Sequence, residues 1–299
     1  MLFKYLLIHL PLTLFILITV NPETPSNTHL YKNNATIKAG NIDLSDWHFE
    51  HNGIVALDGE WEFYWKEALD IQQFLQLQNQ STDTLRYFNF PQPWNKYTIK
   101  GQQLGSTGYA NFVAHLTLNP TQHKQLALRI PAQFSAYRLY LNNELIAYNG
   151  LVSNDSLVST PDLKANLVFF ETKKATNTLL LQVSNYHHRH GGLQQSILLG
   201  TQTQILKKRD NFYGFDFFLF GLLFIMFIYH LVLYWVVNKD RSALYFGLFC
   251  GLILVRILVM GETLLRYFDF PISASWLIKI EYISFFLSGP VFIYFLNSL

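Results

Sequence analysis

The hydrophobic residues of this chain are concentrated at its C-terminal end, and this placement restricts the fold more than any other feature. Three segments there, at about 212–237, 243–260 and 274–297, are long and almost uniformly apolar. A helix rises about 1.5 Å per residue, so each segment is long enough to cross a hydrocarbon core of about 30 Å. The pattern therefore predicts an α-helical transmembrane bundle, with a short polar turn between its first two spans.

A shorter apolar block runs from Leu6 to Val20 and follows Lys4. A positive residue followed by roughly 15 apolar residues is typical of a secretory signal sequence. We predict a signal sequence over residues 1–21, with an uncleaved anchor as the alternative, and a linker over 22–41. Either alternative exports the region that follows. The first span then runs inward, so Lys239 and Arg241 lie in the cytoplasm, as the positive-inside rule expects.

The region between these blocks, residues 42–205, shows short runs in which apolar and polar residues alternate, as over 110–118, 126–130 and 179–183. Alternation of this kind is typical of half-buried antiparallel strands. A hairpin is predicted over 137–148, because Asn142 and Asn143 tolerate the positive φ angles of a tight turn. One helix is predicted over 66–77, with Leu69, Phe74 and Leu77 as its buried positions. Many short strands with frequent turns predict an all-β sandwich of jelly-roll type.

Composition and motifs exclude several functions. The net charge of +2 and the lack of a basic stripe exclude a nucleic-acid binder, and a single cysteine excludes an internal disulfide. Phosphate-binding, dinucleotide and hydrolase motifs are missing, so no cofactor and no catalytic residue is predicted. Glu60 and Glu62 lie two residues apart on one strand, on the side that we expect to face solvent. No metal site is predicted at His187, His188 and His190, because His188 and His190 could share a face but the sequence indicates no third ligand.

Two loops are candidates for ligand binding. Sugars are bound by flat aromatic faces and by a few planar polar groups. Trp94 and Tyr97 lie in a proline-bounded loop, and Asn185, His188 and Arg189 lie in a second loop rich in rings and donors. Loops at one end of a sandwich are common binding places. The alternatives are that Trp94 closes the end of the core and that the second loop is a solvated turn.

The predicted spans contain ionisable residues at similar depth. Asp216, Arg256, Lys279 and Glu281 all lie near the outer ends of the spans. Charged groups at such depth are usually paired or extend to the interface. We therefore predict a polar cluster of Asp216, Arg256 and Glu281, with extension of Arg256 and Lys279 to the membrane surface as the alternative.

Several segments together resemble one family, the bacterial seven-transmembrane receptors with diverse intracellular signalling modules. In the sandwich these segments are 57–64, 108–110, 139–146 and 183–192; in the membrane part they are 221–234, 239–256 and 280–284. The resemblance implies a galactose-binding-like sandwich as the extracellular sensor. The family has seven spans and a cytoplasmic output module, whereas this chain ends just as a third span would emerge.

The resemblance implies a receptor fragment rather than an enzyme. Its periplasmic sandwich, residues 42–205, would sense a small polar, carbohydrate-like ligand and pass the signal to a partial transmembrane domain over 206–299. The expected location is the bacterial inner membrane, with the sandwich outside the cytoplasm. Expected partners are the ligand and the lipid bilayer, with a homodimer left open. The alternatives are a membrane-anchored carbohydrate-binding or scaffolding protein without signalling, and a membrane-bound glycoside hydrolase.

Overall fold

The computed structural model describes residues 35–67, 70–80, 86–99, 101–237, 239–260, 264–268, 270 and 272–299, with the backbone alone for 77–80, 266 and 267. The predicted signal sequence and most of the predicted linker lie outside these residues. The described chain divides into a sandwich unit that ends at Lys208 and a helical unit that begins at Arg209.

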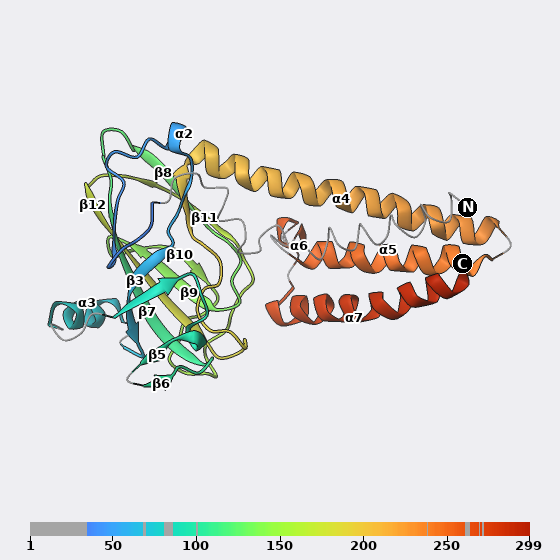
Figure 1. Ribbon diagram of the computed structural model, residues 1–299, viewed down its shortest axis with the longest axis horizontal. Helices are drawn as coiled ribbons and strands as arrows, with labels where there is room; N and C mark the ends of the chain where they lie inside the picture. Colours follow the sequence, from blue (N-terminus) through green and yellow to red (C-terminus); the bar gives the residue numbers. More distant parts are fainter. Residues whose placement is uncertain are drawn as a thin grey trace. The chain divides into compact units, whose positions relative to one another are not determined.

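Two main sheets form the sandwich unit (Figure 1). The larger sheet has the strand order β10-β9-β12-β7-β3-β4, with β1 paired to β7, and the smaller has the order β11-β8-β13-β2. The pairing is antiparallel except for β1 with β7. A separate two-stranded sheet pairs β5 with β6. The strands are β1 (Asn41–Asp43), β2 (Val55–Ala56), β3 (Gly59–Trp65), β4 (Tyr87–Phe90), β5 (Thr98–Ile99), β6 (Gln102–Gln103), β7 (Gly108–Thr117), β8 (Gln125–Ile130), β9 (Ala136–Leu141), β10 (Glu144–Asn149), β11 (Asn166–Glu171), β12 (Thr176–Asn185) and β13 (Leu198–Thr201).

Both units contain helices. They are α2 (Phe49–Asn52), α3 (Ile71–Gln80), the 3-10 helix η2 (Trp94–Lys96), α4 (Gln202–Val236), α5 (Arg241–Val259), α6 (Leu264–Tyr267) and α7 (Ala274–Ser298). Among the described residues, α4, α5 and α7 are long and apolar enough to cross a membrane. The predicted fold class, a β-sandwich followed by membrane-spanning helices, is confirmed.

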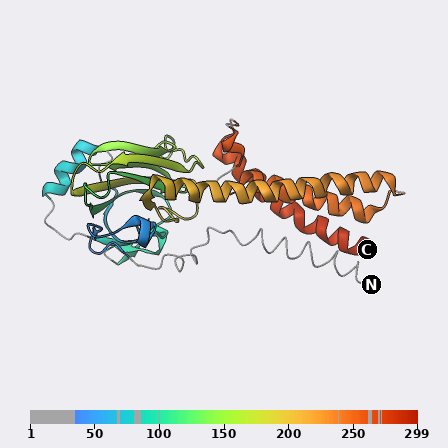
Figure 2. The same cartoon turned by 90° about the horizontal axis from the view of Figure 1, so that it is seen from above.

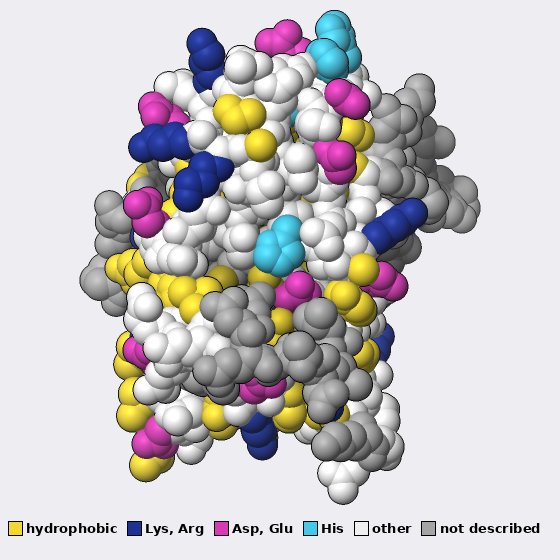
Figure 3. Space-filling model, turned by 90° about the vertical axis from the view of Figure 1, so that its left-hand side faces the viewer, with side chains coloured by type: hydrophobic (Ala, Val, Ile, Leu, Met, Phe, Trp, Pro, Cys, Tyr) yellow, Lys and Arg dark blue, Asp and Glu magenta, His cyan; other side chains and the backbone are white. Residues whose placement is uncertain are grey.

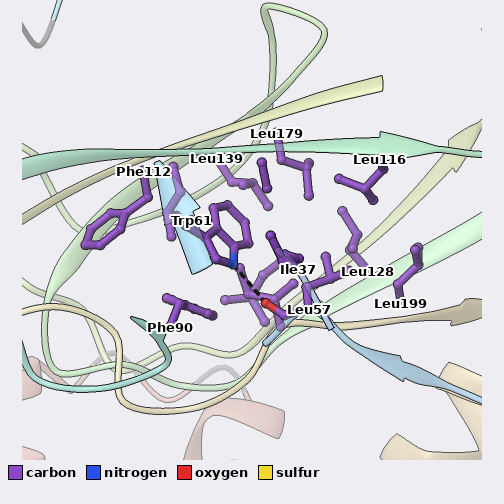
Figure 4. Packing of buried hydrophobic residues seen from close by; sticks show 14 of the residues in the cluster. Ile37, Leu57, Trp61, Phe90, Phe112, Leu116, Leu128, Leu139, Leu179 and Leu199 are labelled. Carbon is purple, nitrogen blue, oxygen red and sulfur yellow. Dashed lines mark hydrogen bonds between the residues drawn. The ribbon is translucent and has the colours of Figure 1, made fainter. Parts of the chain in front are cut away.

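The core of the sandwich is filled by the alternate side chains of its strands (Figure 4). Trp61 and Phe63 of β3 point inward, and Phe63 lies opposite Phe112 of β7. The Trp61 ring is fully buried, and its Nε1 donates a hydrogen bond to the carbonyl oxygen of Leu57 at 2.9 Å. Burying an indole requires a partner for its N–H, and this bond supplies one.

Glu62 on the other face of β3 corrects an expectation. We expected it to face solvent, but it is only 7% exposed. Its carboxylate accepts a hydrogen bond from the Tyr64 hydroxyl at 2.9 Å and lies 3.5 Å from His115 Nε2. A Cβ on Gly40 would lie 2.9 Å from the Glu62 side chain, so the turn before β1 closes over it. Period-two alternation identified the two faces of β3, but it could not show what covers the outer one.

The predicted hairpin and helix are both present. The β9–β10 turn has Asn142 and Asn143 at φ angles of 49° and 74°, which confirms the reason for their choice. Helix α3 begins at Ile71 rather than at Lys66, which has a positive φ of 55°. Asp70 Oδ1 accepts a hydrogen bond from the backbone of Gln73 at 3.0 Å and thereby caps the first turn.

Helix α3 covers part of the outer face of the larger sheet (Figures 1 and 2). Phe74 is fully buried there, as predicted, and its ring meets the Tyr64 ring edge-on at 5.0 Å. Of the other two positions that we expected to be buried, Leu69 and the side chain of Leu77 lie outside the described residues.

The first turn of α4 belongs to the sandwich unit. Gln204 Nε2 donates a hydrogen bond to the carbonyl oxygen of Phe49 at 2.6 Å, and its Oε1 accepts one from the backbone of Thr201 at 3.1 Å. Ile205 is fully buried beside Ala127 and Leu198 on the outer face of the smaller sheet. The helix therefore begins where its side chains can pack against strands.

In the helical unit, α5 packs against α4 and α7 (Figure 1). Two glycines of α5 allow close approach to α4. A Cβ on Gly247 would lie 3.3 Å from the His230 Cβ, and one on Gly251 would lie 3.0 Å from the Phe227 ring. Small residues four apart are a common device of packed membrane helices. Cys250 lies between the two glycines and is 1% exposed.

Candidate functional site

The two predicted ligand loops meet at one end of the sandwich. β12 ends at Asn185, which pairs with Gly108 at the start of β7. The loop after β12 and the loop before β7 therefore leave the sheet at the same place. The segment around η2 and the β8–β9 connection join them there through hydrogen bonds. We call these four segments, residues 91–97, 104–107, 131–135 and 186–196, the loop cluster.

Asn185 shapes the loop cluster from inside. It is 2% exposed, and its Nδ2 donates hydrogen bonds to the carbonyl oxygens of Ser106 at 2.8 Å and His188 at 2.7 Å. Its Oδ1 accepts one from the backbone of His188 at 3.1 Å. All of these bonds hold backbone, so Asn185 positions the loops.

Trp94 lies in the core. It is fully buried, its Nε1 donates a hydrogen bond to the Ser106 carbonyl at 3.2 Å, and its ring meets Trp65 edge-on at 5.1 Å. A Cβ on Gly191 would lie 2.1 Å from Trp94 Nε1, so the second loop passes directly over the indole. This is the core-closing alternative that the sequence left open. In this arrangement the indole offers no free face to a ligand.

Tyr97 is half-buried and is also held within the protein. Its ring meets Phe63 at 5.6 Å and Phe88 at 5.3 Å, both edge-on. Its hydroxyl donates a hydrogen bond to the carbonyl oxygen of Tyr87. Tyr97 thus anchors the end of the η2 loop to β4.

His188 and Arg189 lie at the surface of the loop cluster. The His188 ring stacks on Phe134 at 4.5 Å with an interplanar angle of 10°. Burial lowers the pKa of His188 below its usual value; the hydrogen bond to the His190 backbone opposes this shift, whereas the charges of His190 and Arg189 add to it. The Arg189 side chain is exposed, and its carbonyl oxygen accepts a hydrogen bond from Asn95 Nδ2 at 2.8 Å.

Sequence reasoning missed Asn95 and Phe134. Asn95 joins the two loops, because its Oδ1 also accepts a hydrogen bond from the Gly191 backbone at 2.9 Å. Its place beside Trp94 was visible, but the partner lies more than ninety positions away in the chain. Phe134 lies in a connection without periodicity, so no local pattern indicated it.

The three histidines of the second loop serve different contacts. His187 Nε2 lies 2.8 Å from the Ser159 carbonyl, and His188 Nδ1 lies 3.2 Å from the His190 backbone nitrogen. Among the described residues, the structure has no group of three or more His, Cys, Asp or Glu side chains arranged to hold a metal ion.

The predicted membrane cluster is brought together in part. Arg256 Nη2 lies 3.9 Å from the Glu281 carboxylate, and its Nη1 donates a hydrogen bond to the Glu281 carbonyl at 3.4 Å. The guanidinium also lies over the Phe285 ring at 5.0 Å. Asp216 lies on α4 and is not among these partners of Arg256. The contact therefore joins α5 to α7.

Comparisons with solved structures give only distant likeness. A GH2 beta-galacturonidase from Eisenbergiella tayi is 10% identical with a TM-score of 0.35, over 50% of this chain and 24% of that one. A beta-glucuronidase from uncultured Clostridium sp. is 13% identical with a TM-score of 0.38, over 50% and 29%. One from Ruminococcus gnavus is 14% identical with a TM-score of 0.37, over 49% and 28%. The chain thus spans only 24–29% of the length of these proteins.

The sequence comparisons identify a family for the membrane part alone. No curated protein matches the chain. A family model described as 7TM diverse intracellular signalling matches residues 212–299. This range contains α5, α7 and all of α4 after its first ten residues. Over residues 212–299 the chain therefore matches the 7TM diverse intracellular signalling family, and the resemblance drawn from the membrane segments is confirmed.

Proposed function

We propose that the sandwich senses a small polar, carbohydrate-like ligand and passes the signal to the membrane helices. The family match and the three apolar helices make the chain a multi-pass membrane protein of the signalling-receptor class. The sensor domain is proposed to cover residues 42–205 and the partial transmembrane domain residues 206–299. A ligand changes the arrangement of the helices only by the difference in its affinity for two arrangements.

The loop cluster is the observation that carries this proposal. Its segments are held by hydrogen bonds from buried side chains to backbone, from Asn185 to Ser106 and from Ser135 to Gly192. This leaves a ring pair, Phe134 on His188, beside the exposed Arg189. A held scaffold that presents a ring face and a planar donor fits the recognition of a sugar. Asn185 and Tyr97 support the site from beneath.

The acidic pair of β3 does not extend the proposal to hydrolysis. Glu60 accepts a hydrogen bond from the Ala39 backbone at 3.1 Å, and Glu62 is covered and bonded to Tyr64. A glycosidase needs two carboxyl groups that flank a cleft. These two hold the turn before β1, so we assign them a structural role.

Ligand binding is tested with the full chain in nanodiscs and a panel of neutral and acidic saccharides. A saccharide present at 100 times its Kd stabilises the folded sandwich by about 2.7 kcal/mol, which slows amide exchange in β7 and β12. Phe134→Ala should abolish that protection, whereas Lys173→Gln, at the other end of β12, should keep it. A panel in which every saccharide leaves exchange unchanged contradicts the proposal.

The proposed location is the bacterial inner membrane, with the sandwich outside the cytoplasm. The motif that supports this orientation is the turn at Lys239 and Arg241, since cytoplasmic loops are rich in such residues. Alkaline phosphatase, which is active only outside the cytoplasm, should be active when fused after Gly200. Fused at Lys239 it should be silent. Reversed activities would contradict both the orientation and the exported sensor.

A further inference from the structure

The loop cluster has an uneven charge. Its four segments contain no aspartate or glutamate, while they contain Lys96, Arg189 and three histidines. The same lack of acidic residues extends over residues 84–143 and 172–209, which include the strands β7, β9 and β12 that lead into the loop cluster. Figure 3 shows the side of the unit that carries α3, where acidic, basic and histidine side chains are interspersed. An excess of exposed cations over exposed carboxylates favours anionic ligands.

Two cations reach the surface of the loop cluster from adjoining backbone. Lys96 and Arg189 are both exposed. Asn95, which directly precedes Lys96, donates its Nδ2 hydrogen bond to the Arg189 carbonyl at 2.8 Å. Among the described residues, the ion pairs are formed by other side chains, so neither cation is neutralised by a described carboxylate.

Two acidic side chains approach the loop cluster. Burial raises the pKa of Asp58, whose carboxylate accepts a hydrogen bond from the Ser196 side chain at the end of the cluster. Asp155 lies in the segment that contacts His187 and Tyr186, and its charge contributes to raising the pKa of Tyr186, chiefly caused by burial. Its carboxylate, however, accepts a hydrogen bond from the backbone of Leu157 at 2.9 Å within its own turn. Neither carboxylate forms an ion pair with Lys96 or Arg189 among the described residues.

We propose that the ligand is an acidic saccharide of the uronic acid class, with its carboxylate bound by Arg189 and Lys96 and its ring face against Phe134 and His188. This inference rests on the proposed function, because it specifies the ligand of the same site. A guanidinium binds a carboxylate through two parallel hydrogen bonds, and a lysine adds a point charge. A neutral sugar would use the rings but leave both cations without a partner.

The test compares uronic acids with their neutral parents on the full chain in nanodiscs of zwitterionic lipid. Calorimetric titrations would use glucuronate and galacturonate beside glucose and galactose, with acetate and inorganic phosphate as plain anions. We expect at least tenfold tighter binding of each uronate than of its parent. Arg189→Gln should remove that preference, and Lys96→Gln should reduce it. Lys173→Gln is the matched control, since it changes an exposed cation about 30 Å away along β12 and should have no effect.

The outcomes separate this inference from the proposed function. Equal binding of uronates and neutral sugars overturns the acidic ligand and leaves saccharide sensing intact. Binding of phosphate or acetate as tightly as of uronates overturns it as well, because the site would then be a simple anion site. If no saccharide binds at all, the proposed function itself fails. A preference that survives Arg189→Gln in a protein with native amide exchange also contradicts the assignment.

Discussion

Replacing Trp94 with alanine should destabilise the sandwich by about 3–5 kcal/mol, the usual cost of removing a large buried ring. The indole is fully buried under Gly191, and its N–H holds the Ser106 carbonyl. A domain is stable by only about 5–15 kcal/mol, so the loss is a large fraction of the total. Amide exchange in β7 and β12 should therefore accelerate by two orders of magnitude or more, while exchange in α5 stays unchanged.

Lys96, two residues after Trp94, provides the control. Lys96 lies in the same helical turn but is exposed, so Lys96→Ala should change stability by no more than about 0.5 kcal/mol. If Trp94→Ala leaves strand exchange at the wild-type rate, the ring does not close the core. It would then be free to stack on a ligand, as the sequence first suggested.

Arg256→Leu should weaken the helical unit because it leaves the Glu281 carboxylate without its partner on α5. By insertion measurements, an ionised group in the middle of a span costs about 2.5–3.5 kcal/mol, and pairing relieves part of that. Adding Glu281→Gln should recover part of the loss. We expect a coupling energy of about 0.5–3 kcal/mol, measured by unfolding the full chain in mixed micelles with rising SDS.

Asp216 provides the comparison within the same unit. Because Arg256 contacts Glu281 on α7, the effect of Asp216→Asn should simply add to that of Arg256→Leu. Coupling to Asp216 but not to Glu281 would contradict the pairing described here. Strict additivity of Arg256→Leu and Glu281→Gln would favour the alternative in which Arg256 extends to the membrane surface.

Much of the fold was predictable because it depends on periodicity. Alternation located β7, β8 and β12, and two consecutive asparagines located the β9–β10 turn. Length and hydropathy located the three membrane-capable helices. These signals are local, so no knowledge of partners was needed. The start of α3 was placed five residues early, because hydrophobic spacing does not show the positive φ of Lys66 or the cap at Asp70.

The candidate site was less predictable because its contacts join residues that are far apart in the sequence. The sequence pointed to both loops, but it could not distinguish a ring that offers a face from one that fills the core. Trp94 is covered by Gly191, and Asn185 is turned inward to Ser106. Each contact joins residues about eighty or more positions apart. Phe134 and Asn95 became candidates only once the sheet register had brought four segments to one end.

The burial of Cys250 makes the chain directly suitable for site-specific labelling. It is the single cysteine of the sequence and is 1% exposed within the helical unit. A maleimide probe should therefore react with an introduced surface thiol and leave the native one unmodified. Spin labels attached to Thr107→Cys and Lys173→Cys, both at exposed positions, would report distances between the two ends of the sandwich. A change in this distance on ligand binding then becomes measurable by pulsed electron paramagnetic resonance, without first preparing a cysteine-free variant.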